Sequence, residues 1–228
     1  MAENNTMLLA IGGAGGNVLD FIRRETNHNR LKEARYAFAN CNENDLNNYL
    51  IDNSQLILLD SEQDEFPEDV FDGIEKLFII AGLGGKTGTN YAELAASSAR
   101  QHGVEEITVI AILPFNFEGE KRRERSLSAA KRIQSIHGVS LVCIDNEEID
   151  KKYPNLNFLA AFGAAGKEIM KVLENAIENV DTIPACELPQ LEKDKIAHSK
   201  MYAFSTVHRF ISEVRAKIKE IIERCVRN

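Results

Sequence analysis

The feature that most constrains the fold is an alternation of short apolar runs with longer stretches that have helical periodicity. Runs rich in Val, Ile and Leu are typical of buried strands, and the amphipathic stretches between them are typical of crossover helices that join parallel strands. The predicted strands are residues 7–11, 36–40, 55–59, 76–81, 107–113 and 139–144, and the predicted helices are residues 15–26, 43–50, 68–74, 88–102, 120–137 and 157–181. The sequence therefore predicts an α/β fold, a Rossmann-like three-layer structure with a parallel sheet and helices on both of its faces.

The pattern changes near Ile183. The segment IPACELPQLEKDK holds two of the chain's five prolines and has no periodic apolar face, which predicts a linker. Apolar residues then recur at spacings of three and four from Phe204 to Cys225, in a stretch with six Lys or Arg against three Asp or Glu from Phe204 onward. This spacing predicts a C-terminal amphipathic helix, which docks on the sheet or pairs with a second copy. We expect one main domain over residues 1–183, then the linker and helix over residues 184–228.

Composition excludes several classes of protein. A net charge of −8 disfavours a general nucleic-acid binder. No apolar run approaches the ~20 residues needed to cross a bilayer, and the N-terminal residues lack the basic region of a secretion signal. The four cysteines form no CxxC pair and the five histidines show no metal-ligand spacing. We expect a cytoplasmic protein with no nucleic-acid or membrane partner, no metal site and no side chain that acts as a catalytic nucleophile.

Two glycine-rich segments each follow a predicted strand and open a predicted helix. We call them the first glycine loop, IGGAGGN (residues 11–17), and the second glycine loop, AGLGGKTGTN (residues 81–90). At such turns the backbone N–H groups and the positive end of the helix converge, and glycine lets a phosphate approach the backbone. Two such loops at one edge of a sheet are suited to gripping one polyphosphate. The alternative is that each loop is only a tight turn between a strand and a helix.

Neither loop fits the two most familiar phosphate-binding patterns. A GxxxxGK[ST] loop that ended at Lys86 would need its first glycine at residue 80, where the sequence has Ile80. A GxGxxG pattern that began at Gly13 and Gly15 would need its third glycine at residue 18, where the sequence has Val18. A different phosphate-binding family is therefore indicated.

Taken with four further segments in the same order, the loops resemble the GTPase domain of the FtsZ and tubulin family. The second glycine loop is similar to the family's GGGTGTG signature, and the first is similar to its first phosphate loop. The segment FANCNENDL is similar to the family's strand-end Asn-Thr-Asp segment, and LPFNFEGEKR (residues 113–122, here the ribose loop) resembles the pattern PFxFEGxxR. The segments IDNEEI and LAAFGAAGKEIM resemble the base-binding segment and the start of the central helix.

The resemblance implies a site for GTP or GDP, with Mg²⁺ as an open possibility. It implies phosphate contacts from Gly12, Gly13, Gly15, Gly16, Asn17, Gly84, Gly85, Thr87, Gly88 and Thr89, and the nucleotide site is expected to include Asn40 and Lys86 as well. It also implies ribose contacts from Glu118 and Arg122, and base contacts from Asn146, Phe162 and the position of Gly166. The run EKRRER (residues 120–125) is then interpreted as one ribose-facing arginine beside a solvated face.

The chain also departs from the family's pattern at the base and the phosphates. An Asp or Asn on the family's central helix reads guanine, whereas this chain has Gly166 there, so guanine recognition is weakened and ATP or an empty site stays an alternative. Lys86 replaces a signature glycine and either offsets a phosphate charge or points to solvent. Seven acidic residues lie between Asp60 and Asp72. We interpret them as a solvated loop, in preference to a Mg²⁺ site.

The family's Asn-x-Asp-x-x-Asp loop, whose acids complete the neighbouring subunit's site, has no match in the segment TIPACELPQLEKDK. The family's usual C-terminal sheet domain has no counterpart in the sequence either. We therefore expect a divergent, truncated protein that binds a guanine nucleotide with weak or no hydrolysis, in bacterial cell-division-type assembly or its regulation. The alternative is a non-catalytic protein that caps or modulates filaments of a full-length relative.

Overall fold

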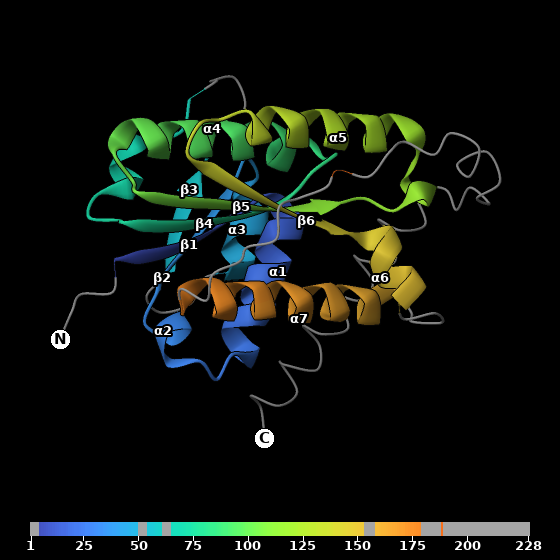
Figure 1. Ribbon diagram of the computed structural model, residues 1–228, viewed down its shortest axis with the longest axis horizontal. Coiled ribbons are helices and arrows are strands. Elements are labelled where there is room, and N and C mark those ends of the chain that lie inside the picture. The colour runs from blue at the N-terminus through green and yellow to red at the C-terminus, as the bar shows by residue number, and fades with distance from the viewer. Residues whose placement is uncertain (1–4, 50–53, 61–64, 153–157, 179–187, 189–228) are drawn as a thin grey trace.

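The computed structural model describes residues 5–49, 54–60, 65–152, 158–178 and 188, and these form a single parallel sheet covered by helices (Figure 1). The strands are β1 (Thr6–Ile11), β2 (Arg35–Asn40), β3 (Ser54–Leu58), β4 (Lys76–Gly82), β5 (Glu106–Leu113) and β6 (Val139–Asp145). They lie in the order β3-β2-β1-β4-β5-β6, and every neighbouring pair is parallel. All the predicted strands are confirmed.

Helices cover both faces of the sheet. The helices are α1 (Gly12–Glu25), α2 (Asn29–Lys32), α3 (Glu43–Leu46), α4 (Lys86–His102), α5 (Glu120–Gln134), α6 (Asn146–Lys152) and α7 (Phe158–Ile177). Short 3-10 turns lie at Asn47–Tyr49, Glu68–Phe71 and Asn116–Glu118. Helices α4 and α5 lie on one face, and α1 and α7 lie on the other (Figure 1). The three-layer α/β fold predicted from the sequence is confirmed.

The side chains of β1 divide between the two layers, as the period of two in a strand requires. Met7, Leu9 and Ile11 belong to a buried cluster with α4 and α5, whereas Leu8 and Ala10 belong to a second cluster with α1 and α7. Each of these side chains is at most 1% exposed. Because both faces of a central parallel strand are buried, the strand reads as a continuous apolar run.

Several predicted helix boundaries were wrong. Helix α1 begins at Gly12 and α4 at Lys86, because the glycine loops already take part in the first helical turn. The predicted helix over residues 68–74 is a 3-10 turn of four residues, bracketed by Pro67 and Gly73. One helix was expected over residues 43–50, but residues 43–49 form α3 and a 3-10 turn, and helices α2 and α6 were not predicted.

The predictions for residues 184–228 fall outside the described residues except at Leu188, which packs against the cluster beneath α4 and α5. The linker, the C-terminal amphipathic helix and the domain boundary at residue 183 therefore stay predictions. Among the helices that the structure describes, none is long and apolar enough to cross a membrane.

The strand order places a topological switch point between β1 and β4. From β1 the sheet grows through β2 to β3 in one direction, and from β4 it grows through β5 to β6 in the other. The chain leaves β1 into α1 below the sheet and leaves β4 into α4 above it (Figure 1). In open α/β sheets, ligands bind outside the carboxyl ends of the strands at such a point. Both glycine loops lie there.

Candidate functional site

The two glycine loops contact each other at the carboxyl ends of β1 and β4. A Cβ atom placed on Gly12 would lie 3.2 Å from the backbone nitrogen of Gly88, and one placed on Gly82 would lie 2.5 Å from Cβ of Ala14. Gly12 also has a φ of 74°, a left-handed conformation that favours glycine. The loops are therefore one surface made of two segments that are about seventy residues apart in the chain.

Most of the glycines in these loops serve close packing. A Cβ atom on Gly15 would lie 2.2 Å from the carbonyl oxygen of Ile80, and one on Gly88 would lie 2.3 Å from that of Gly82. One on Gly16 would lie 2.6 Å from the ring of Tyr49. Glycine at these positions lets α1 and α4 approach the strands and rings beside them.

Two glycines face open space instead. A Cβ atom on Gly13 would have no neighbour within 4 Å, and one on Gly85 would meet only Nη2 of Arg122, at 4.0 Å. The helices that begin at these loops have no side-chain cap and no acidic residue in their first turns. Uncapped N–H groups beside an approachable backbone favour an anion. Gly13 and Gly85 are therefore the glycines at which a phosphate has room to approach.

The second glycine loop is braced from within and from α5. The N–H of Gly84 donates to Oγ1 of Thr89 over 2.7 Å, and Gly84 has a φ of 98°. A Cβ atom on Gly84 would lie 2.8 Å from Cγ of Arg122, so this arginine lies beside the second glycine loop. Lys86 is exposed at the start of α4 and Thr87 is half-buried. Lys86 of α4 and Arg122 of α5 thus place one cation each beside the second glycine loop.

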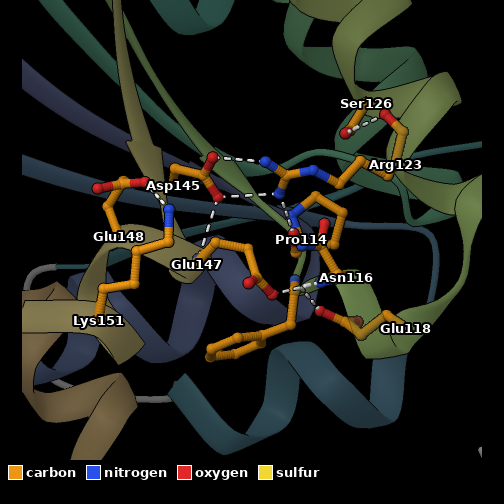
Figure 2. Close-up of polar contacts among 10 residues, drawn as sticks. Pro114, Asn116, Glu118, Arg123, Ser126, Asp145, Glu147, Glu148 and Lys151 are labelled. Atoms are coloured by element: carbon orange, nitrogen blue, oxygen red, sulfur yellow. Dashed lines mark hydrogen bonds and ion pairs between the residues drawn. The ribbon is translucent and has the colours of Figure 1, made fainter. Parts of the chain in front are cut away.

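Glu118 stabilises the conformation of the ribose loop to which it belongs. Oε1 of Glu118 accepts from the N–H of Phe115 over 2.9 Å, and Oε2 lies 3.3 Å from Nη1 of Arg122. The N–H of Asn116 donates to Oε1 of Glu147 over 2.6 Å, which joins the ribose loop to α6 (Figure 2). Asn146, the first residue of α6, is 8% exposed. The structure therefore brings the expected ribose and base segments side by side.

The interpretation of residues 120–125 as a single site-facing arginine with a solvated face was wrong. Arg123 is 5% exposed, and its guanidinium donates to both carboxylate oxygens of Asp145 and to the carbonyl of Pro114 (Figure 2). The signal was present in the helical spacing, because Arg123 shares the buried face of α5 with Ser126, Leu127 and Ala130.

Two of the three expected base positions lie on α7. Gly166 is buried, and a Cβ atom there would lie 2.6 Å from Cδ1 of Phe21 on α1. An aromatic ring therefore covers the position at which the resemblance expects a guanine-reading side chain. The side chain of Phe162 lies outside the described residues.

Asn17 and Asn40, two of the asparagines expected in the site, differ in their surroundings. Asn40 is 5% exposed, accepts from the N–H of Asn42 over 3.3 Å and donates to Asp45 over 3.4 Å, so it shapes the turn after β2. Asn17 is exposed, and its Oδ1 accepts from the hydroxyl of Tyr49 over 2.8 Å. Sequence reasoning missed Tyr49, because it lies at the end of a short helix whose apolar period is too brief to mark a buried ring. Among the described residues, no group of three or more His, Cys, Asp or Glu side chains could hold a metal ion.

The comparisons with known proteins agree with this geometry. A family model described as "Tubulin/FtsZ family, GTPase domain" matches residues 68–154, which include the second glycine loop and the ribose loop. This chain is similar to the FtsZ/tubulin family. The cell division protein FtsZ of Buchnera aphidicola subsp. Schizaphis graminum is 28% identical over 199 residues, which cover 78% of this chain and 49% of that relative.

Solved FtsZ/tubulin-family structures share the fold. An empty FtsZ dimer from M. jannaschii has a TM-score of 0.64 at 22% identity, over 80% of this chain and 57% of that one. A CetZ2 protofilament with GTPγS from Haloferax volcanii has a TM-score of 0.63 at 16% identity, over 78% and 60%. The chain thus spans about half the length of the FtsZ relative. Because relatives come from archaea as well as bacteria, the expected bacterial origin stays a prediction.

Proposed function

We propose that this chain binds one guanine nucleotide, GTP or GDP, across the two glycine loops, with weak or no hydrolysis. The observation that carries the proposal is the contact between the loops at the switch point of the sheet, where Gly13 and Gly85 face open space. Similarity to the FtsZ/tubulin family supports a guanine nucleotide in preference to another polyphosphate.

In this proposal the two helix N-termini and two side-chain cations hold the phosphates. Lys86 supplies charge at the phosphates, and Arg122, which the resemblance assigns to the ribose, adds to it because its side chain lies beside Gly84. Glu118 holds the ribose from a loop that its own carboxylate has already folded. Asn146 offers an amide to the base. Weak hydrolysis is expected because the segment after the central helix fits the Asn-x-Asp-x-x-Asp pattern only in part, with Asn179 and Asp181 present and Pro184 in place of the second Asp.

Calorimetry on the purified full chain tests the binding proposal. GDP and GTP are expected to bind with a stoichiometry of about one per chain, as a single switch-point site requires. The parallel titrations use ADP and ATP, which share the phosphates and ribose but not the base. Failure of both guanine nucleotides to bind, together with none carried through purification, would reject the proposal. Steady GTP turnover that rises with protein concentration would overturn the claim of weak hydrolysis.

A second candidate function is supported by the same incomplete acidic segment. A chain with a nucleotide-binding face and only one of the two acids of that segment is suited to join the end of a filament without extending it. The CetZ2 structure is described as a protofilament, so assembly occurs among proteins of this fold. Light scattering of a full-length FtsZ, with this chain at substoichiometric amounts, is expected to show shorter or fewer filaments. Unchanged scattering would reject capping.

A further inference from the structure

Tyr49 contacts the first glycine loop from the neighbouring β-α unit. We infer that Tyr49 is a positioning residue, which orients the carboxamide of Asn17 so that its N–H groups meet the oxygens of the bound nucleotide. Its hydroxyl donates to Oδ1 of Asn17 over 2.8 Å and lies 3.4 Å from the carbonyl oxygen of Gly13. The inference rests on the proposed function and adds a residue that neither the sequence patterns nor the family motifs contain.

The ring of Tyr49 is held on two sides. It stacks on Phe38 with the centroids 4.7 Å apart and the planes 10° apart, and it is 4% exposed. On the other side lies Gly16, where a Cβ atom would come within 2.6 Å of the ring and its hydroxyl. Gly16 is thus the residue that lets the ring approach α1. A ring held in this way places its hydroxyl at one point.

Asn17 lies above the open glycine of the first loop. Gly13 and Asn17 are four residues apart on α1, so they share a face of the helix. Side chains on a helix lean toward its N-terminus, which carries the Asn17 carboxamide toward Gly13. Gly13 is one of the two glycines at which a phosphate has room. The carboxamide therefore lies on the approach to the proposed phosphate site.

In the structure the hydrogen bond from Tyr49 holds the carboxamide of Asn17 with Oδ1 toward the ring hydroxyl. An asparagine side chain can rotate by half a turn and exchange its oxygen for its nitrogen. Because Oδ1 of Asn17 is held by the hydroxyl, the Nδ2 group projects on the opposite side, and it makes no hydrogen bond to any described residue. Two N–H donors near a helix N-terminus suit a phosphate or ribose oxygen, whereas an exchanged oxygen would repel it.

The test is a double-mutant cycle on GDP affinity, measured by calorimetry. Y49F keeps the ring and removes only the hydroxyl, and is expected to weaken GDP binding by about 3- to 10-fold, the range for one hydrogen bond. N17A is expected to weaken binding at least as much. If Tyr49 acts through Asn17, the double variant Y49F/N17A binds GDP no more weakly than N17A alone. Additive losses would overturn the positioning role.

Y36F is the matched control. The hydroxyl of Tyr36 donates to the carbonyl oxygen of Leu31 over 2.9 Å in a buried part of β2 away from the glycine loops. This variant is expected to lower the unfolding midpoint without changing GDP affinity, so a loss of affinity in Y49F alone is not a general effect of stability. Unchanged GDP affinity in Y49F would overturn the inference and leave nucleotide binding intact. No binding by the wild-type chain would overturn the proposed function and the inference together.

A second measurement covers the case in which Y49F fails to fold. The side-chain amide resonances of Asn17 in the wild-type chain are expected to shift when GDP is added, since its Nδ2 group would meet the ligand. N17D is expected to lose more affinity than N17A, because a carboxylate offers no donor and repels a phosphate. Resonances that do not move, or an N17D variant that binds as well as N17A, would overturn the inference.

Discussion

Arg123 and Asp145 form a buried ion pair that ties α5 to the end of β6. Nη1 and Nη2 of Arg123 donate to Oδ1 and Oδ2 of Asp145, the first over 2.9 Å, and the two side chains are 6% and 10% exposed. Oδ1 of Asp145 also accepts from the N–H of Glu147 over 3.1 Å, at the start of α6. Arg123 reaches the carbonyl of Pro114 as well. One pair therefore fixes the beginning of the ribose loop against the base segment.

Removing one member of this pair is expected to cost more stability than removing both. R123M leaves the Asp145 carboxylate buried without its partner, a loss of about 3 to 5 kcal/mol in the free energy of unfolding. D145N in the R123M background removes that charge, so the double variant is expected to be more stable than R123M alone. Urea denaturation measures the free energy of unfolding of the wild-type chain, of R123M and of the double variant. R125M is the control, because Arg125 is exposed on the same helix, and it is expected to change stability by less than about 0.5 kcal/mol. Equal losses in R123M and R125M would contradict a structural role for the pair.

The central part of the sheet was predictable because burial of both faces leaves its mark in each central strand separately. Strand β5 holds six apolar residues, one threonine and one acid in EITVIAIL, and no distant residue is needed to interpret it. Arg123 shows the opposite case. Its helical spacing places it on the buried face of α5, but the carboxylate that pairs with it is 22 residues away in the chain. A local pattern cannot show such a partner.

The sequence predicted which loops form the candidate site, but it did not predict what each residue in those loops contacts. Gly13 and Gly15 are both glycines of the first glycine loop, yet Gly13 faces open space and Gly15 lies against the backbone of β4. That difference depends on the twist and register of β4 beside α1. The Tyr49 contact with Asn17 is likewise decided by packing on Phe38, which the sequence places in a different segment.

Gly13 and Gly15 give a matched pair of substitutions. G15A places a Cβ atom within 2.2 Å of the Ile80 carbonyl oxygen, so α1 has to move from β4 and stability is expected to fall by about 1 to 3 kcal/mol. G13A meets no atom within 4 Å, so the fold is expected to tolerate it, while GDP affinity falls because the methyl group occupies the space proposed for a phosphate. Thermal unfolding and calorimetry on both variants separate the two effects. A G13A variant with normal GDP affinity would place the phosphates elsewhere.

Gly166 is expected to resist replacement by the acid that the family's pattern would supply. G166D brings a side chain against the ring of Phe21, where Cβ alone would lie 2.6 Å from Cδ1, and overpacking of this kind costs about 1 to 3 kcal/mol. F21A in the same chain opens that space and is expected to reduce the penalty of G166D. G163D is the control on α7, because no atom lies within 4 Å of a Cβ atom at Gly163. The measurement is the free energy of unfolding, and equal effects of G166D and G163D would refute the contact with Phe21.

Tyr36 is expected to make the fold sensitive to high pH. Burial raises the pKa of Tyr36 from 10.0 to about 12, and the nearby Arg23 opposes this only in part. Below pH 10 the phenol is neutral in both the folded and the unfolded chain, so its contribution to stability is constant. Between pH 10 and 12 the unfolded chain loses the proton while the folded chain keeps it, so the free energy of unfolding falls as the pH rises.

Comparison with Y36F isolates this contribution from the other groups that titrate at high pH. At pH 8 the variant is expected to be less stable by about 1 kcal/mol, because it lacks the hydrogen bond to the Leu31 carbonyl. At pH 11 that difference is expected to shrink by about 1 kcal/mol, since only the wild-type chain has a tyrosine at this position to ionise on unfolding. Urea unfolding at both pH values measures the change. Two stability profiles that stay parallel from pH 8 to pH 11 would show that Tyr36 ionises equally well in the folded protein, against its burial beneath the end of α2.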